Sequence, residues 1–337
     1  MESSSGSHPP SSILQPQDPR VLLLAGPTAV GKSEIALLLA ERLGAEIVSV
    51  DSMQVYRGLD IGTAKPSTAE LARVRHHLID VADLADSFDA AQFLRLARSA
   101  VADIHARGKV ALLCGGTGLY FKAFLQGLGE TPPGNLQLRA QLQTTPLPEL
   151  LNELAERDPV TFERIDRQNP RRIIRAVEVI RLTGKPFSQQ RAVWGQSNRL
   201  APSASHFFGL IRSTEDLRRR IAARVDDMFR RGMVAETEQL LRRGLVNNQT
   251  AMQALGYRQV AEYLQGVRSL PETIELVRIR TRQFAKRQMT WFRRQLPLTW
   301  IHLTTSDAPD NVAKRIAQRF ASESPTRSAV LGDQGII

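Results

Sequence analysis

The stretch LLLAGPTAVGKSEIALLLA, residues 22–40, contains the phosphate-binding pattern G-x-x-x-x-G-K-[ST]. The apolar run before it predicts a buried strand, and leucines at helical spacing after it predict a helix that ends at Gly44. Because the motif requires strand, glycine-rich turn and helix in this order, the context favours a loop whose backbone N–H groups face an anion. The positions that the pattern specifies are occupied by Gly26, Gly31, Lys32 and Ser33.

The predicted loop binds phosphates, but the motif does not identify the compound that carries them. Lys32 adds a positive charge, and the Ser33 hydroxyl can ligate a Mg²⁺ that the phosphates also bind. An ordinary glycine-containing turn is the alternative, and the correct flanks on both sides argue against it. The loop consists of Gly26, Pro27, Thr28, Ala29, Val30, Gly31, Lys32 and Ser33.

Composition narrows the class of protein further. The chain has 337 residues, of which 42% are hydrophobic, so it can form one large domain or a core with a second lobe. No apolar run approaches the ~20 residues that span a bilayer, so no membrane partner is expected. The single cysteine, Cys114, excludes a structural zinc finger or a disulfide framework and fits the reducing cytoplasm.

Basic residues are clustered along the chain, which has a net charge of +11. The clusters RQNPRRIIRAVEVIR, EDLRRRIAARVDDMFRRG and VRIRTRQFAKRQMTWFRRQL consist mostly of arginine and favour a polyanionic partner. In the last cluster, four basic side chains fall within about 80° of one another on a helix, which predicts a stripe facing phosphates. A solvated charged face is the alternative interpretation of this stripe, which consists of Arg278, Arg282, Lys286 and Arg293.

Strand and helix patterns alternate in the first third of the chain, which predicts an α/β fold: a P-loop NTPase-like parallel sheet covered by helices. Further strands are expected over 45–50, 109–114 and 207–211, and a helix over 88–107. An inserted all-helical lobe is expected before the last of these strands, and the Ser/Pro-rich start is expected to be a disordered tail and not a secretion signal. The predicted organisation is a disordered tail over 1–19, a core over 20–125 and 206–320, a helical insertion domain over 126–205 and a flexible tail over 321–337.

The strand that precedes GGTG lacks the carboxylate with which P-loop ATPases hold Mg²⁺. The available acid is Asp51, at the end of the second predicted strand. Because ligands bind beyond the carboxyl ends of parallel strands, Asp51, Thr117 and the P-loop are expected to converge on one crevice. Asp51 is therefore predicted to act as a base or anchor for a nucleophile attacking a group carried by the phosphates; a helix cap before Met53 is the alternative.

The motifs GPTAVGKS, SVDSMQVYRGLDIGTAKP, HHLID, GGTGLY, GYRQ and KRQMTWFR, in this order, closely resemble the bacterial tRNA dimethylallyltransferase family. The resemblance covers roughly residues 20–320. It implies transfer of a dimethylallyl group from dimethylallyl diphosphate, the co-substrate, to the exocyclic amine of the adenosine just 3′ of the anticodon. The tRNAs concerned read codons that begin with U, and diphosphate leaves. The motif is typical of ATP- and nucleotide-binding proteins, but here it would hold the prenyl diphosphate.

The resemblance also implies residue roles. Asp51 matches the family's base, Thr117 the threonine that contacts the flipped adenosine, and Arg224 an arginine that clamps the diphosphate; these are the predicted catalytic residues. Ser33 is the predicted ligand of Mg²⁺, and the expected protein is a cytoplasmic monomer that binds the anticodon stem-loop of tRNA. The predicted tRNA contacts are Asp51, Ser52, Met53, Gln54, Thr117, Arg139, Arg171, Arg172, Ile173, Ile174, Arg175, Gln253, Ala254, Leu255, Gly256, Tyr257, Arg258, Lys286, Arg287, Gln288, Met289, Thr290, Trp291, Phe292 and Arg293.

Three other hypotheses remain open at this point. The chain could be an isopentenyltransferase acting on free adenine nucleotides, a P-loop small-molecule kinase, or a non-catalytic RNA-binding module. The helical insertion and the basic C-terminal helix favour RNA over a free nucleotide, and a binding module leaves the P-loop unexplained. His76 and His77 lack a spaced third ligand and are assigned to structure or substrate positioning, while Trp291 and Phe292 are expected to be core residues.

Overall fold

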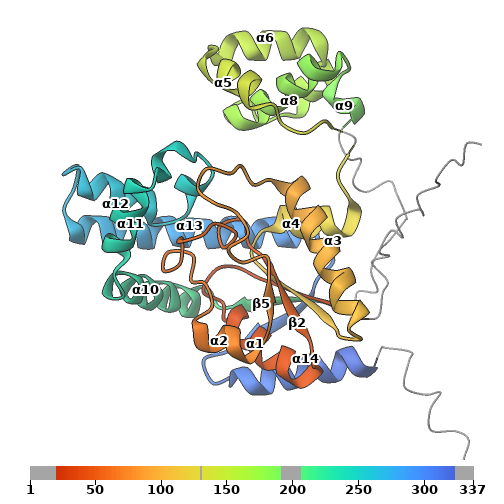
Figure 1. Ribbon diagram of the computed structural model, residues 1–337, viewed down its shortest axis with the longest axis vertical. Helices are drawn as coiled ribbons and strands as arrows, with labels where there is room; N and C mark the ends of the chain where they lie inside the picture. The colour runs from red at the N-terminus through yellow and green to blue at the C-terminus, as the bar shows by residue number, and fades with distance from the viewer. Residues whose placement is uncertain (1–19, 130, 191–205, 323–337) are drawn as a thin grey trace, which may run out of the picture. The chain divides into compact units, whose positions relative to one another are not determined.

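The computed structural model describes residues 20–129, 131–190 and 206–322. The strands of these residues form a six-stranded sheet in the order β3-β2-β4-β1-β5-β6 (Figure 1). All pairs of neighbouring strands are parallel, which confirms the predicted α/β fold. The strands are β1 (Val21–Ala25), β2 (Glu46–Val50), β3 (His76–His77), β4 (Ala111–Gly115), β5 (Phe207–Arg212) and β6 (Thr299–Leu303).

Side-chain alternation along the strands gives the sheet two apolar faces. On one face, Leu22 and Leu24 of β1 pack with Phe208 of β5 beneath helices α1 and α14. On the other face, Phe207 of β5 contacts Phe121 of α4, with ring centroids 5.8 Å apart. The helices named here are α1 (Lys32–Leu43), α4 (Gly118–Gln126) and α14 (Pro309–Ser322).

Several of the remaining helices of the core unit begin at a side-chain cap. The hydroxyl of Ser213 accepts the Asp216 N–H at 3.1 Å and begins α10. Ser269 and Glu272 form a capping box that begins α13, the longest helix described, with 26 residues. These helices are α2 (Thr68–Arg73), α3 (Ala90–Ala106), α10 (Thr214–Arg230), α11 (Met233–Arg242), α12 (Tyr257–Leu264) and α13 (Leu270–Gln295), with short 3₁₀ turns at Leu245–Asn247 and Ala251–Gln253.

Residues Gln126–Arg199 form a second compact unit. Its described part is helical and has its own apolar core, which includes Leu150, Leu154 and Val177. Because the core is formed within the unit, the helices do not depend on the sheet for burial of their apolar faces. The helices are α5 (Leu136–Thr144), α6 (Leu147–Arg157), α7 (Pro159–Arg164), α8 (Pro170–Thr183) and α9 (Phe187–Gln190).

The structure adds elements that the sequence patterns did not predict. β3 has two residues, too few for a periodic pattern, and β6 lies in a stretch for which no strand was expected. α14 continues to Ser322, so the flexible tail predicted from 321 is wrong for its first two residues. The predictions for 1–19, 191–205 and 323–337 lie outside the described residues. Within the described part, none of the helices is both long and apolar enough to cross a membrane.

The two histidines of β3 belong to the sheet, and one of them contributes to a charge cluster around Glu46. The Glu46 carboxylate, 2% exposed, receives Arg107 and His77, each at 2.7 Å, and Lys109 at 3.1 Å. Burial opposes ionisation of Glu46, but the hydrogen bonds from these partners outweigh it and hold its pKa at about 2. The structural interpretation of His77 is therefore supported.

Replacing Glu46 by glutamine is expected to lower the free energy of unfolding by about 2 kcal/mol at pH 7. The carboxylate has a lower pKa in the folded protein, so its stabilisation is complete above the ordinary pKa near 4.5 and is lost as the pH falls towards 2. The difference between wild type and Glu46→Gln should therefore shrink between pH 5 and pH 3 in urea titrations. Asp103→Asn, which removes an exposed partner of Arg107, is the control with a smaller effect. A pH-independent difference would contradict the prediction.

Candidate active site

The loop after β1 is shaped to receive an anion. Ala29 and Gly31 adopt left-handed conformations, with φ of 64° and 108°, which turn successive backbone N–H groups towards one side of the loop. At the N-terminus of α1, no described side chain caps the helix. The free N–H groups of its first turn therefore remain available to a ligand.

A cavity of ≈ 700 Å³ lies against this loop. Lys32 lines it from α1, and Arg220 and Arg224 line it from α10. Arg220 also donates from Nε to the Ala29 carbonyl at 2.9 Å, which ties α10 to the loop. The sequence prediction included Arg224 but missed Arg220, although the two lie four residues apart and share one helix face. The structure thus assembles a cationic pocket from two separate elements.

Lys32 is fixed next to the P-loop, in surroundings that lower the pKa of its ammonium group. Its Nζ donates to the Pro27 carbonyl at 2.7 Å. Lost hydration lowers its pKa to about 8; nearby Cys114 opposes this shift, Arg224 adds to it and Asp51 opposes it. Lost hydration also lowers the pKa of Arg224, and attraction to Asp51 opposes it. Both cations would gain from a bound diphosphate.

Asp51 follows β2 and uses one carboxylate oxygen in its local turn. Oδ1 accepts the Met53 N–H at 2.8 Å and the Gln54 N–H at 3.3 Å. The alternative of a helix cap is wrong, because a turn and not a helix follows, although the side chain does bind these local backbone N–H groups. Within the described residues, Oδ2 has no hydrogen-bond partner, so the same carboxylate can also accept a proton or hydrogen bond from a substrate.

Thr117 connects the loop after β4 to the loop after β2. Its hydroxyl oxygen accepts the Ser52 N–H at 3.1 Å, and its own N–H donates to the Val50 carbonyl at 3.1 Å. The backbones are so close here that a Cβ on Gly115 would lie 2.0 Å from the Val50 oxygen, which only glycine avoids. The predicted meeting of the β2 and β4 loops is therefore observed, and Thr117 has a bracing role in it.

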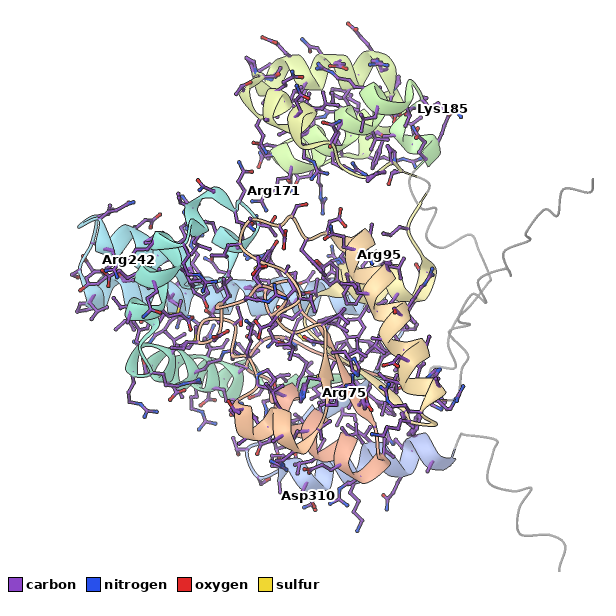
Figure 2. The ribbon with its side chains drawn as sticks, viewed as in Figure 1. Arg75, Arg95, Arg171, Lys185, Arg242 and Asp310 are labelled. Atoms are coloured by element: carbon purple, nitrogen blue, oxygen red, sulfur yellow. The ribbon has the colours of Figure 1, made fainter. Side chains whose placement is uncertain are left out.

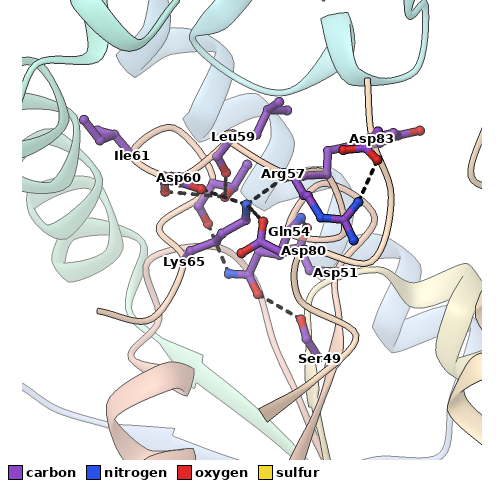
Figure 3. A network of polar contacts seen from close by, with 12 residues as sticks. Ser49, Asp51, Gln54, Arg57, Leu59, Asp60, Ile61, Lys65, Asp80 and Asp83 are labelled. Carbon is purple, nitrogen blue, oxygen red and sulfur yellow. Dashed lines mark hydrogen bonds and ion pairs between the residues drawn. The ribbon is translucent and has the colours of Figure 1, made fainter. Parts of the chain in front are cut away.

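The segment after Asp51 is held by internal polar contacts (Figure 3). Gln54 receives the Ser49 hydroxyl at 2.8 Å and donates from Nε2 to the Thr63 and Ala64 carbonyls, each at 3.2 Å. Lys65 donates to the Tyr56 carbonyl at 2.6 Å and also binds Asp60 and Asp80. Gln54 was predicted to contact tRNA, whereas its amide in this structure stabilises the loop.

Several predicted tRNA contacts, one in the helical unit and the others in the core unit, have side chains enclosed by protein. The Tyr257 hydroxyl donates to Glu236 at 2.6 Å and accepts the Gly62 N–H at 3.1 Å, which anchors the loop of Figure 3 to α11 and α12. Such side chains expose too little surface to bind RNA directly in this structure. Contact between RNA and other atoms of the same segments remains a prediction. The enclosed members of the predicted set are Ile173, Ala254, Tyr257, Gln288 and Phe292.

In the second unit, a buried carboxylate organises two of the predicted contacts. Glu178, 0% exposed, receives Arg139 at 3.0 Å and Arg175 at 2.6 Å. It also accepts the Asn135 N–H at 2.8 Å. Arg171 lies at the surface of the same unit (Figure 2). In this unit, Arg139 and Arg175 are therefore held in place by Glu178, whereas Arg171 is exposed to solvent.

Two of the four basic side chains of the stripe on α13 are paired with acidic residues and are less available to bind phosphates. Arg278 pairs with Asp226 and Glu275, and Arg282 pairs with Glu275 at 2.8 Å. Lys286 and Arg293 are exposed, and in the part of the chain that the structure describes neither forms an ion pair. The prediction of four phosphate-facing cations is therefore better restricted to these two residues. They also line a cavity of ≈ 770 Å³ between α10 and α13.

A metal site made of protein ligands alone is absent from the described residues, since no three His, Cys, Asp or Glu side chains cluster suitably. Ser33 nevertheless fits the predicted role. It is exposed and lines the cationic cavity beside Lys32. Mg²⁺ commonly takes one or two protein oxygens and completes its shell with substrate phosphates and water, which suits a lone hydroxyl here.

A phosphate-binding loop, enclosed cations and a carboxylate at neighbouring strand ends define a P-loop α/β protein with a site for a phosphate-bearing substrate. The sequence model of the IPP transferase family matches residues 54–295. Because this match covers most of the chain, the protein belongs to the IPP transferase family.

Relatives support the same assignment across most of the chain. The tRNA dimethylallyltransferase 2 of Geotalea daltonii is 42% identical over 306 residues, covering 89% of this chain and 92% of the relative. The tRNA dimethylallyltransferase of Geobacillus kaustophilus is 42% identical over 300 residues, with coverage of 88% and 93%. The P-loop and Asp51 precede the segment that the family model matches.

Solved structures give the same result for the fold. The full-length tRNA isopentenylpyrophosphate transferase of Bacillus halodurans has a TM-score of 0.63 at 36% identity, covering 90% of this chain and 97% of that chain. A eukaryotic dimethylallyltransferase, described as acting on tRNA, has a TM-score of 0.73 at 27% identity, covering 92% and 81%. The chain is therefore similar to these enzymes in sequence and in structure.

The lowered pKa of Lys32 predicts that diphosphate binding weakens at alkaline pH. Above pH 8 the free lysine loses its proton and its attraction for the anion, so the Kd of dimethylallyl diphosphate should rise about tenfold from pH 7 to pH 9. Lys32→Arg should show a much flatter profile, because arginine stays protonated throughout this range. Isothermal titration calorimetry measures both profiles, and parallel curves for the two proteins would exclude Lys32 as the titrating group.

Proposed function

We propose that this chain transfers a dimethylallyl group from dimethylallyl diphosphate to tRNA. The acceptor is the exocyclic amine of the adenosine 3′-adjacent to the anticodon, in tRNAs that read codons beginning with U, and diphosphate is released. Membership of the IPP transferase family and the names of the relatives support the activity. The observation that carries the proposal is the position of Asp51. It directly follows Val50, which is in register with Gly115 of β4, and Gly115 is in register with Ala25, the last residue before the P-loop.

The reaction is a displacement at an allylic carbon. The adenosine nitrogen forms a bond to that carbon while the bond from carbon to the diphosphate oxygen breaks, and the electron pair leaves with the diphosphate. Negative charge therefore grows on the leaving group, where Lys32, Arg224 and the free N–H groups of α1 stabilise it. The amine loses one proton, which Asp51 accepts through Oδ2 while Oδ1 keeps the turn in place.

Magnesium enters the proposal through Ser33. The hydroxyl would hold Mg²⁺ together with the diphosphate oxygens, and the ion would neutralise charge on the leaving group. The protein's own contribution is to hold the diphosphate end at the loop through Lys32, Arg220 and Arg224, which all line the same cavity.

The acceptor has to be unstacked to reach Asp51, and a single-stranded anticodon loop allows this at a cost of a few kcal/mol. We assign RNA contact to the exposed basic residues Arg171, Arg172, Lys286 and Arg293, and to Arg139 and Arg175 beside Glu178. We further propose that the protein modifies tRNA as a monomer in the cytoplasm. Transfer to AMP, or phosphate transfer from ATP, would instead support the two alternative enzymes.

Asp51→Asn is the sharpest test of the proposed base. The asparagine oxygen can still accept the Met53 N–H, so the turn persists, but the side chain no longer accepts a proton. Turnover should fall about 100-fold or more, while tRNA affinity changes less than about twofold. Asp51→Ala, which also removes the turn contact, should be at least as inactive.

The measurement is transfer of a labelled five-carbon unit to an anticodon stem-loop, followed by nucleoside mass analysis. Wild-type protein that leaves no five-carbon unit on RNA would refute the proposed function. Full turnover by Asp51→Asn, with the wild type active, would refute the base assignment alone.

The pairing pattern on α13 predicts which cations bind RNA phosphates. Each phosphate contact contributes about 0.7 to 0.9 to the slope of log K against log salt concentration. Lys286→Ala combined with Arg293→Ala should lower the slope by about 1.5, since both side chains are available. Arg278→Ala with Arg282→Ala is the matched control on the same helix and should change it by less than half as much. Fluorescence anisotropy at several salt concentrations measures the slopes; equal changes would contradict the prediction.

A further inference from the structure

Gln288 of α13 bridges two loops of the candidate active site. Its Oε1 accepts the Thr28 N–H of the P-loop at 2.8 Å. Its Nε2 donates to the Gly116 carbonyl, in the loop after β4, at 2.9 Å. The residue is 8% exposed, so both ends of the amide are used inside the protein.

The two partners require opposite hydrogen-bonding roles from one side chain. The Thr28 N–H can only donate and the Gly116 carbonyl can only accept, so the side chain must supply an acceptor and a donor together. A carboxamide does this without carrying a charge. A glutamate would repel the Gly116 oxygen, and a methionine of similar length would leave both backbone groups unpaired.

The Gln288 side chain connects the loop that would bind the diphosphate with the loop next to the proposed base. Thr28 belongs to the loop that faces the diphosphate, and Gly116 precedes Thr117, which binds Ser52 next to Asp51. A change in the distance between these loops would therefore move the leaving group relative to the base. Small displacements of this kind can lower catalysis strongly, because the reacting atoms have to be aligned.

Aromatic packing holds α13 in place around Gln288, so the amide can determine the distance between the P-loop and the loop after β4. Trp291 packs over Gly118, where an added Cβ would come within 2.1 Å of the indole ring. Phe292, fully buried, contacts Phe121 with ring centroids 6.3 Å apart. These aromatic contacts fix α13 against α4, the helix that begins two residues after Gly116.

We propose that Gln288 is a positioning residue that keeps the diphosphate end and the acceptor end of the site aligned. The proposal rests on the transferase function proposed above. It replaces direct RNA contact as the role of this side chain, while the exposed Lys286 and Arg293 of the same helix keep that role.

The test compares Gln288→Met and Gln288→Glu with Gln283→Met as the control. Gln283 lies on the same helix, but it is exposed and receives only Arg280, at 3.4 Å. Both variants at 288 should lose at least about tenfold in kcat at pH 8, with KM for both substrates and tRNA affinity within about threefold of wild type. Gln283→Met should behave like the wild type.

A pH profile separates positioning from a loss of folding. A protonated glutamic acid has one donor and one acceptor and so imitates the amide, and its burial beside a carbonyl raises its pKa. The kcat of Gln288→Glu relative to wild type should therefore rise as the pH falls from 8 to 6, whereas the ratio for Gln288→Met stays flat. If Gln288→Met fails to fold, the profile of Gln288→Glu decides alone.

Wild-type kcat in both variants, or a flat profile for Gln288→Glu, would overturn the proposal. A loss confined to tRNA affinity would also overturn it and would assign the side chain to RNA contact. Failure of the proposed function is a different outcome, because the wild-type protein itself would then leave no five-carbon unit on RNA.

Discussion

The anion pocket depends on two positively charged side chains, Lys32 and Arg224, that the fold shields from water. Lys32 and Arg224 both have lowered pKa values because they lose hydration, and no carboxylate binds either of them directly among the described residues. A bound diphosphate would supply the missing counter-charge, so the free energy of binding includes relief of this electrostatic cost. Asp51 is near enough to stabilise both cations, yet it keeps one oxygen open because the other holds its turn.

Alignment of the site follows from the packing of the strand ends. β2 and β4 approach so closely at Val50 and Gly115 that no side chain fits between them. Thr117 fastens the same two loops by hydrogen bonds, and Gln288 fastens the loop after β4 to the P-loop. These contacts come from four separate segments of the sequence, so the geometry of the site depends on the complete fold of the core unit.

The basic residues of the chain have different roles in the structure, and many of them are paired with acidic side chains. Arg278 and Arg282 are paired with acids, Arg139 and Arg175 surround a buried glutamate, and Arg107 belongs to the cluster at Glu46. Paired arginines contribute less to RNA attraction than exposed, unpaired ones, because a local acid already neutralises them. A net charge of +11 therefore indicates a polyanionic partner but does not locate its binding surface.

The sequence by itself determined the features that depend on local order. The pattern around Lys32 and the alternation of strands and helices predicted the P-loop, the parallel sheet and the helical unit, because these signals act over a few neighbouring residues. Only the tertiary structure decided that Gln288 is enclosed, that Arg220 joins the pocket and that β6 completes the sheet. Each of these depends on contacts between residues far apart in the chain, which no local pattern contains.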